Sequence, residues 1–156
     1  MSGFIAVAEA GPGQCVAVAN SRFWPDIDLK VLREAMRIDA TVTAARLLGA
    51  VTEAMASVNH ELRGWRQQQQ ALGYAAAEEV PAEQIAGASI VLHRYLRAVG
   101  CRTKASLVER LRDFDTTAGG EKRAENQEQN IEELRRDALW AISDIAGRSR
   151  NTVDLI

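Results

Sequence analysis

The side chains of this 156-residue chain that could carry chemistry are few and lie far apart. Its two histidines, His60 and His93, have no cysteine or carboxylate at the spacing of metal ligands except Glu61. On a helix, the residue next to His60 points away from the His60 face, so this pair cannot share a metal. We therefore interpret both histidines as ordinary surface or boundary residues, and we expect neither a metal nor a cofactor.

The cysteines give a second candidate chemistry. Cys101 has Arg97, Arg102 and Lys104 nearby in the sequence, and such cations can lower the pKa of a thiol. No base partner accompanies it, so we expect a packed thiol. Cys15 lies in a dissimilar context, which indicates two reduced thiols in a cytoplasmic setting and no disulfide scaffold.

Two further patterns resemble catalytic ones only superficially. Asp113 and Asp115 could form a carboxylate pair for metal binding or acid–base work. Because Thr116 and Thr117 follow them just before a helical pattern, we favour capping and turn formation. Residues 119–122 are glycine-rich but lack the spacing and the Ser or Thr of a phosphate-binding loop. The sequence therefore predicts a protein that is not an enzyme.

Length and composition favour one helical domain. The chain is long enough for a single core, and apolar residues make up 47% of it. Its many Ala, Leu, Glu, Arg and Gln residues favour helix. The net charge of −2 argues against a strongly basic nucleic-acid binder. The sequence contains neither a signal-peptide pattern nor an apolar run long enough for a membrane span, so we expect synthesis in a cytoplasm and no membrane.

The pattern divides the chain into three parts. Residues 1–25 read as an extended N-terminal arm, in which residues 4–7 and 15–18 are either a small hairpin or segments that lie along a neighbour. Residues 26–147 form the helical domain, and residues 148–156 form a tail. We expect an all-α fold, an elongated antiparallel bundle of about four helices.

The expected helices follow from caps and apolar spacing. The first runs from Asp28 to Ile38, and the second is capped by Asp39 or Thr41 and continues to about residue 70. The seam of the second advances by alternating steps of three and four through Thr41, Ala44, Leu48, Val51, Met55, Val58, Leu62 and Trp65. One continuous helix of this length would be about 43 Å long, which predicts an elongated molecule. The third helix covers 86–112, with a possible kink at Gly100, and the fourth covers 121–146.

Charge is segregated along the second half of the chain. Most charged residues in 94–112 are basic, whereas most charged residues in 113–137 are acidic. We expect these regions to pair within one chain or between copies, where such asymmetry suits a head-to-tail ring. The candidate inter-subunit residues are Arg94, Arg97, Lys104, Asp113 and Asp115. The alternative is that the same arginines contact DNA.

The tail is apolar where most chain ends are polar. It follows Gly147, at which the last helix stops, and apolar side chains in water there would cost free energy. We therefore expect the tail to dock on a partner, although the alternative is that it folds back on its own bundle. The candidate docking residues are Arg148, Arg150, Val153, Leu155 and Ile156.

Several blocks, in the same order, resemble the head completion proteins of P2-like tailed bacteriophages. The likeness spans roughly residues 22–156 and is densest at the end of the chain, whereas residues 1–21 match only loosely. No block is a catalytic motif, so the specificity lies in their number and order. The blocks are Phe23-Trp24-Pro25-Asp26-Ile27-Asp28, residues 32–39, residues 41–47, Ser57-Val58-Asn59, Trp65-Arg66, residues 112–117 and residues 135–156.

The resemblance implies a structural role in the virion. Such proteins join the DNA-filled capsid at its portal vertex after packaging and form a ring of adaptor subunits on which the tail or its terminator docks. They look like the helical head–tail adaptors of other long-tailed phages, which commonly match the twelvefold symmetry of the portal. It implies as partners the phage portal protein, further copies of the chain, and a tail terminator or tail completion protein. Packaged DNA would pass through the ring without sequence-specific binding. The alternative is a helical DNA-binding packaging accessory factor, similar to a small terminase.

Overall fold

The computed structural model describes residues 17–112 and 121–149. Within these residues the fold is mainly helical, with two very short antiparallel sheets. The helices are α1 Leu29–Ala35, α2 Ala44–Glu61, α3 Arg63–Ala71, α4 Ile90–Arg112 and α5 Glu121–Ile145, with a 3-10 turn η1 at Ala77–Glu79. The strands are β1 Ala17–Val18, β2 Ile27–Asp28, β3 Gln84–Ile85 and β4 Ala88–Ser89.

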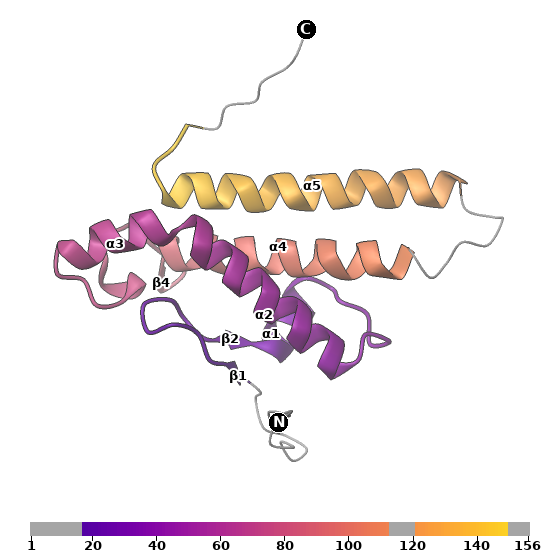
Figure 1. The fold of residues 1–156 in the computed structure, drawn as a ribbon, viewed down its shortest axis with the longest axis horizontal. Coiled ribbons are helices and arrows are strands. Elements are labelled where there is room, and N and C mark those ends of the chain that lie inside the picture. Colours follow the sequence, from indigo (N-terminus) through magenta and orange to yellow (C-terminus); the bar gives the residue numbers. More distant parts are fainter. Residues whose placement is uncertain (1–16, 113–120, 150–156) are drawn as a thin grey trace, which may run out of the picture.

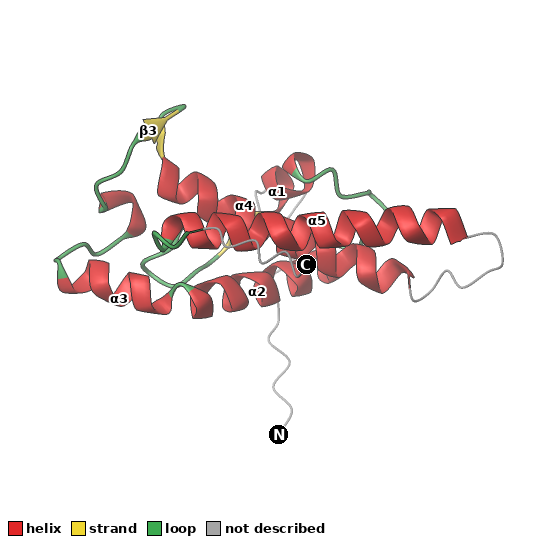
Figure 2. Ribbon diagram, turned by 90° about the horizontal axis from the view of Figure 1, so that it is seen from above, coloured by secondary structure: helices red, strands yellow, loops and turns green. Residues whose placement is uncertain are grey.

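An antiparallel pair of long helices, α4 and α5, forms the length of the molecule (Figure 1). α2 crosses α4, and α1 with the β1–β2 hairpin lies on the other side of α4 from α5 (Figures 1 and 2). The bounds predicted for the last helix agree with α5 to one residue. Ile131, Ala138, Ile142 and Ile145 are buried along one of its faces, as the spacing predicted. The expectation of a mainly helical bundle is confirmed. The described residues form five α-helices rather than about four, and two short antiparallel sheets depart from the expected all-α fold.

The first helix is shorter than predicted. Asp28 caps it, and its side chain accepts hydrogen bonds from the backbone N–H groups of Lys30 at 2.8 Å and Val31 at 3.1 Å. α1 then ends at Ala35 rather than at residue 38, because Arg37 adopts a left-handed φ of 48°. The bond from the N–H of Ile38 to the carbonyl of Arg33 closes this helix end.

The second helix starts later than predicted and buries a different stripe. Thr43 is its cap, whereas Asp39 accepts a bond from the N–H of Thr41 at 2.8 Å within the preceding turn. This bond holds the pKa of Asp39 below its usual value. The buried stripe runs through Leu47, Ala50, Val51, Ala54, Met55 and Val58. The predicted seam is wrong at its first two positions, which are exposed, and Leu48 is half-buried against the core.

The predicted continuous spine is two helices. Leu62, which is fully buried, has φ −91° and ψ 1° and separates α2 from α3. These dihedrals depart from the helical region at one residue. The N–H of Leu62 still bonds the carbonyl of Val58 at 3.0 Å, and its own carbonyl accepts from the N–H of Arg66 at 2.9 Å. The prediction of one 43 Å helix is therefore wrong. Trp65 of α3 packs against Phe23 and Trp24, the aromatic side chains that follow β1.

The two hairpins were not predicted as they occur. Residues 17–18 pair with residues 27–28, so the segment expected to be an extended arm is joined to the helical domain across the proposed boundary at 25–26. Residues 4–7, the other expected extended stretch, lie outside the described residues. β3 and β4 meet at Ala86 and Gly87, both at positive φ as a two-residue hairpin turn requires. The third helix consequently begins at Ile90, not at residue 86.

Gly100 serves close packing, and α4 is one helix through this position. A Cβ atom there would lie 2.9 Å from Sδ and 3.1 Å from Cγ of Met36. Glycine thus lets the end of α1 approach α4 closely. The kink allowed for at Gly100 does not divide α4, and this glycine is instead a contact site between α1 and α4.

Candidate interaction surfaces

An aromatic cluster ties the N-terminal hairpin to the helices. Trp24 stacks on Tyr95 of α4 with ring centroids 4.4 Å apart, and on Trp65 of α3 at 5.8 Å. Phe23 meets Trp24 edge-on at 5.0 Å. Aromatic pairs in such geometries contribute roughly 0.5–1.5 kcal/mol each beyond the burial of their area. The Phe-Trp and Trp-Arg blocks of the sequence resemblance therefore meet at one packing centre.

A ring of polar side chains borders this cluster. The hydroxyl of Tyr95 donates to Oδ1 of Asn59 at 2.7 Å and accepts from Nδ2 of Asn20 at 2.8 Å. Nδ2 of Asn59 in turn donates to Oδ1 of Asn20 at 2.9 Å. Burial raises the pKa of Tyr95 to about 12, although the bond from Asn20 acts in the opposite direction. This network joins the chain before β2 to α2 and α4, which fixes the orientation of three elements.

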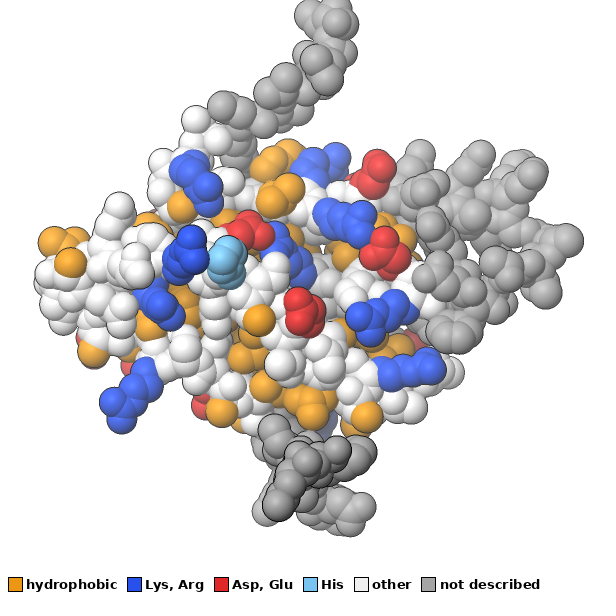
Figure 3. Space-filling view, in the orientation of Figure 1, with side chains coloured by type: hydrophobic (Ala, Val, Ile, Leu, Met, Phe, Trp, Pro, Cys, Tyr) orange, Lys and Arg blue, Asp and Glu red, His pale blue; other side chains and the backbone are white. Residues whose placement is uncertain are grey.

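The face shared by α4 and α5 carries paired charges. Arg97 donates to Asp137 at 3.0 Å, and Arg94 lies 3.7 Å from Asp144. These residues and Trp140 line a surface hollow of about 390 Å³. The charge pattern allowed Arg94 and Arg97 to pair either within one chain or between copies. In the structure, both pair within the chain. On the face of the molecule that Figure 3 draws, in the orientation of Figure 1, cationic, anionic and apolar side chains are interspersed.

Cys101 is buried behind this face. Its pKa is raised, chiefly because burial disfavours the thiolate and secondly because Asp137 is close, and these effects outweigh Arg97 and Lys104. A thiol with a raised pKa is a poor nucleophile at neutral pH. The interpretation of Cys101 as a packed thiol is therefore confirmed.

The two histidines are exposed, as expected. Nε2 of His93 lies 2.8 Å from the carbonyl oxygen of Ile85, which ties α4 to the β3–β4 hairpin. His60 is exposed near the end of α2. Across residues 17–112 and 121–149, no group of three or more His, Cys, Asp or Glu residues is arranged to hold a metal ion.

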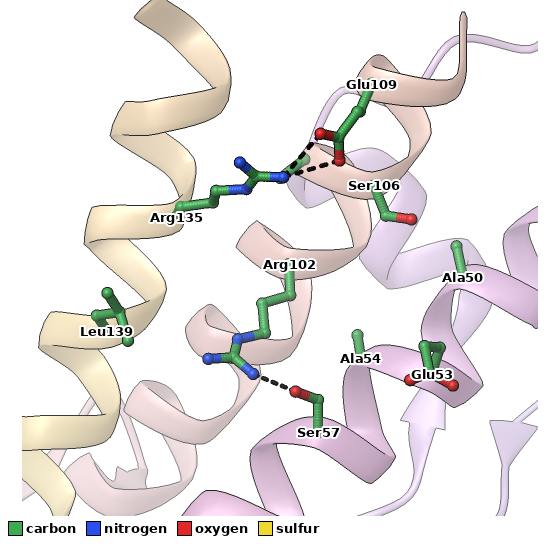
Figure 4. Close-up of a pocket in the computed structure, with 10 residues that line it drawn as sticks. Ala50, Glu53, Ala54, Ser57, Arg102, Ser106, Glu109, Arg135 and Leu139 are labelled. Carbon is green, nitrogen blue, oxygen red and sulfur yellow. Dashed lines mark hydrogen bonds and ion pairs between the residues drawn. The ribbon is translucent and has the colours of Figure 1, made fainter. Parts of the chain in front are cut away.

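A second groove, of about 360 Å³, lies between α2, α4 and α5 (Figure 4). Small side chains line much of it, including Ala50, Ala54 and Ala105, and Leu139 of α5 borders it at 51% exposure. Two bridges cross it. Arg102 of α4 donates to Ser57 and Glu61 of α2, and Arg135 of α5 donates to both carboxylate oxygens of Glu109 at 2.8 Å.

The remaining predicted site residues are placed only in part. Arg148 is exposed, and its N–H bonds the carbonyl of Ser143 at 2.9 Å, which with Gly147 at φ 66° caps α5. Lys104 is half-buried on α4. Six predicted residues lie outside the described residues: Asp113, Asp115, Arg150, Val153, Leu155 and Ile156.

Sequence reasoning did not find the Arg102–Glu61 bridge or the Asn20–Tyr95 bond. The partners lie 41 and 75 positions apart, and no local pattern connects them. The blocks of the sequence resemblance did include Phe23, Asn59 and Trp65. All three residues lie at the same packing centre, so these blocks were the signal that pointed to it.

The fold and its surfaces together define the class of protein. It is a helical scaffold with an aromatic packing centre and grooves along its helix pairs. No helix in the described part of the chain is long and apolar enough to cross a membrane. A protein family described as "Phage head completion protein (GPL)" matches residues 18–156. The chain is also 43% identical over 139 residues to the "Head completion/stabilization protein" of Escherichia phage P2, a match that covers 89% of this chain and 82% of that protein. No solved structure matches the chain significantly.

The chain belongs to the phage head completion protein family. The resemblance seen in the sequence is thereby confirmed, and with it a structural, virion-associated role in the phage head.

Proposed function

We propose that the protein forms a ring of adaptor subunits on the portal once DNA has been packaged, and that this ring offers the docking surface for the tail. Family membership supports the head-completing part of this role. The ring would hold twelve copies and would bind the portal protein on one side and a tail terminator or tail completion protein on the other. DNA would pass through its lumen without sequence-specific contacts.

The pairing of arginines is the observation that favours this adaptor over the DNA-binding alternative. Four arginines each form an ion pair with an Asp or Glu of a facing helix: Arg94, Arg97, Arg102 and Arg135. A DNA-binding surface needs cations that are free to neutralise phosphates. The adaptor therefore predicts no useful affinity for duplex DNA at moderate salt, whereas a packaging factor predicts a shifted band with a steep salt dependence.

The portal contact is assigned to the tail. Arg148 and Arg150 would pair with portal carboxylates, and Val153, Leu155 and Ile156 would anchor in an apolar cleft. In support, the chain between α5 and Ser149 leaves the helix on the side away from α4 (Figure 1), and Arg148 is exposed there. A segment that departs from the body in this way is placed to reach a partner.

The ring contact is assigned to Arg94, Arg97 and Lys104 of one copy and Asp113 and Asp115 of the next. Arg97 is 61% exposed beside Asp137, so its guanidinium has room for a second carboxylate. Because Arg94 and Arg97 already have partners within the chain, such a contact would add to these pairs or exchange them. Exposed pairs are worth only about 0–1 kcal/mol each, so exchange would cost little.

Deletion of residues 149–156 tests the portal contact. The deletion leaves α5 and its cap intact, so the far-ultraviolet circular dichroism should match that of the full chain. The truncated protein should fail to attach to DNA-filled, portal-bearing heads. A matched control replaces Val153, Leu155 and Ile156 by serine at full length, and it should fail in the same way. Truncated protein that still completes heads would disprove the assignment.

A further inference from the structure

We propose that the tip of α3 in one copy, headed by Leu72, seats in the groove between α2, α4 and α5 of the next copy. This inference deepens the proposed ring and rests on it. It names a contact between copies that is separate from the pairing of α4 charges.

The tip is an exposed apolar projection. Leu72 is 71% exposed, the highest value among the large hydrophobic residues of the described chain that lie at the surface. It directly follows α3, a helix that contributes no buried residue. In both ribbon views α3 lies at one end of the molecule (Figures 1 and 2). An apolar side chain held out on a projecting helix end is costly in water unless a partner covers it.

The groove has the complementary shape and polarity. Ala50, Ala54 and Ala105 keep it open, and Leu139 offers an apolar wall that is itself half exposed. A volume of about 360 Å³ accommodates a leucine side chain together with part of the helix end that carries it. Small residues on a helix surface allow a second helix to approach closely, since they leave no side chains to displace.

Charge favours this orientation. α3 contains Arg63 and Arg66 and no carboxylate, whereas Glu53 at the groove forms no ion pair within the described residues. The groove arginines Arg102 and Arg135 are already paired with Glu61 and Glu109. Glu53 is therefore the groove charge that is open to the arginines of α3.

The contact must join two copies. Leu72 follows Ala54 by 18 residues, almost all of them in α2 and α3, which corresponds to about 27 Å along the helices. The tip therefore lies at a distance from its own groove along the α2–α3 path. Tip and groove are different surfaces, so their union is head-to-tail, and repetition of one head-to-tail contact closes into a ring when the rotation allows.

Single-cysteine cross-linking tests this contact. Leu72→Cys and Leu139→Cys are made in separate chains with Cys15 replaced by serine, while the buried Cys101 is kept. Both substituted positions are exposed, so both chains should fold. The two proteins are mixed, loaded onto portal-bearing heads under reducing conditions, and then oxidised. We expect a disulfide-linked dimer that requires both proteins.

The matched control is Val31→Cys, which is 60% exposed on α1 and should form no dimer with Leu139→Cys. Head completion is scored on the reduced sample, which separates the two proposals. Completed heads without a 72–139 dimer would overturn the tip-in-groove contact and leave the proposed function standing. A dimer formed by Leu72→Cys alone would also overturn it, because it would indicate tip-to-tip association. Failure of the unsubstituted protein to bind portal-bearing heads would contradict the proposed function itself.

Discussion

The hydroxyl of Tyr95 on α4 donates a hydrogen bond of 2.7 Å to Oδ1 of Asn59 on α2. Through Asn20 the same network reaches the loop between β1 and β2. Three chain segments therefore depend on one buried phenol, whose ring also stacks on Trp24. A scaffold protein needs its surfaces in fixed relative positions, and this network supplies such a constraint at the centre of the molecule.

Tyr95→Phe should destabilise the fold by about 1–3 kcal/mol, because it leaves the amide groups of Asn20 and Asn59 short of a partner. Urea unfolding followed by tryptophan fluorescence measures the change. Tyr74→Phe is the control, since the Tyr74 hydroxyl forms no hydrogen bond within the described residues, and it should change stability by less. Equal effects of the two substitutions would show that the network contributes nothing beyond ring packing.

The same phenol predicts a pH dependence. The folded-state pKa of Tyr95 is about 12, against an ordinary value of 10.0. A raised pKa means that the folded state holds the proton more tightly, so the stabilisation is complete below pH 10 and is lost as the pH rises through 12. The stability difference between wild type and Tyr95→Phe should therefore narrow above pH 10. A difference that stays constant to pH 12 would mean that the phenol ionises as readily in the folded chain as in the unfolded one.

Gly100→Ala should destabilise the protein by about 1 kcal/mol. The new Cβ would lie 2.9 Å from Sδ of Met36, and overpacking of about 1–3 kcal/mol exceeds the gain in helix propensity of about 1 kcal/mol. Gly49→Ala on α2 is the matched control, because nothing lies within 4 Å of its added Cβ, and it should stabilise by up to about 1 kcal/mol. Thermal unfolding of both variants decides the point, and stabilisation by both would refute the close contact.

Reversal of Arg94 and Arg97 to Glu should weaken ring assembly in a salt-sensitive way. It should lower the stability of the single chain only slightly, since exposed pairs contribute about 0–1 kcal/mol each. Arg110→Glu, an exposed position on the same helix, is the control. Sedimentation at low and high salt reports assembly on isolated portals. Rings that form equally well with reversed charges would show that these arginines act only within their own chain.

The sequence predicted elements whose signals are local and long. α5 has apolar residues at helical spacing over many turns, and its predicted bounds agree with the structure to one residue. Asp28 was predicted to begin the first helix and caps it. Local signals failed where one residue decides the direction of the chain. The break at Leu62 and the positive φ of Arg37 each lie in the backbone dihedrals of one residue, and neither residue type indicates such a conformation in the sequence.

The hairpins and the groove depend on tertiary contacts in the same way. Strands of two residues show no period-two pattern, so β1 and β4 could not be recognised from spacing. The seam of the second helix was predicted with Leu48 inward; Leu48 is half-buried against the core, while Leu47, which the seam left out, is fully buried. The groove is formed by three separate helices, with Ala50 and Ala54 from α2, Ala105 from α4 and Leu139 from α5. In the sequence, the alanines of this groove favour helix and do not indicate a groove.

Imaging of the neck of assembled particles tests the central claim most directly. Heads completed with the full chain, compared with heads that lack it, should show a ring of additional helical density on the portal, with the α4–α5 pair recognisable as its longest feature. The ring should be missing when residues 149–156 are deleted. Density for this protein at any other position of the head, with an uncovered portal in DNA-filled particles, would contradict the account.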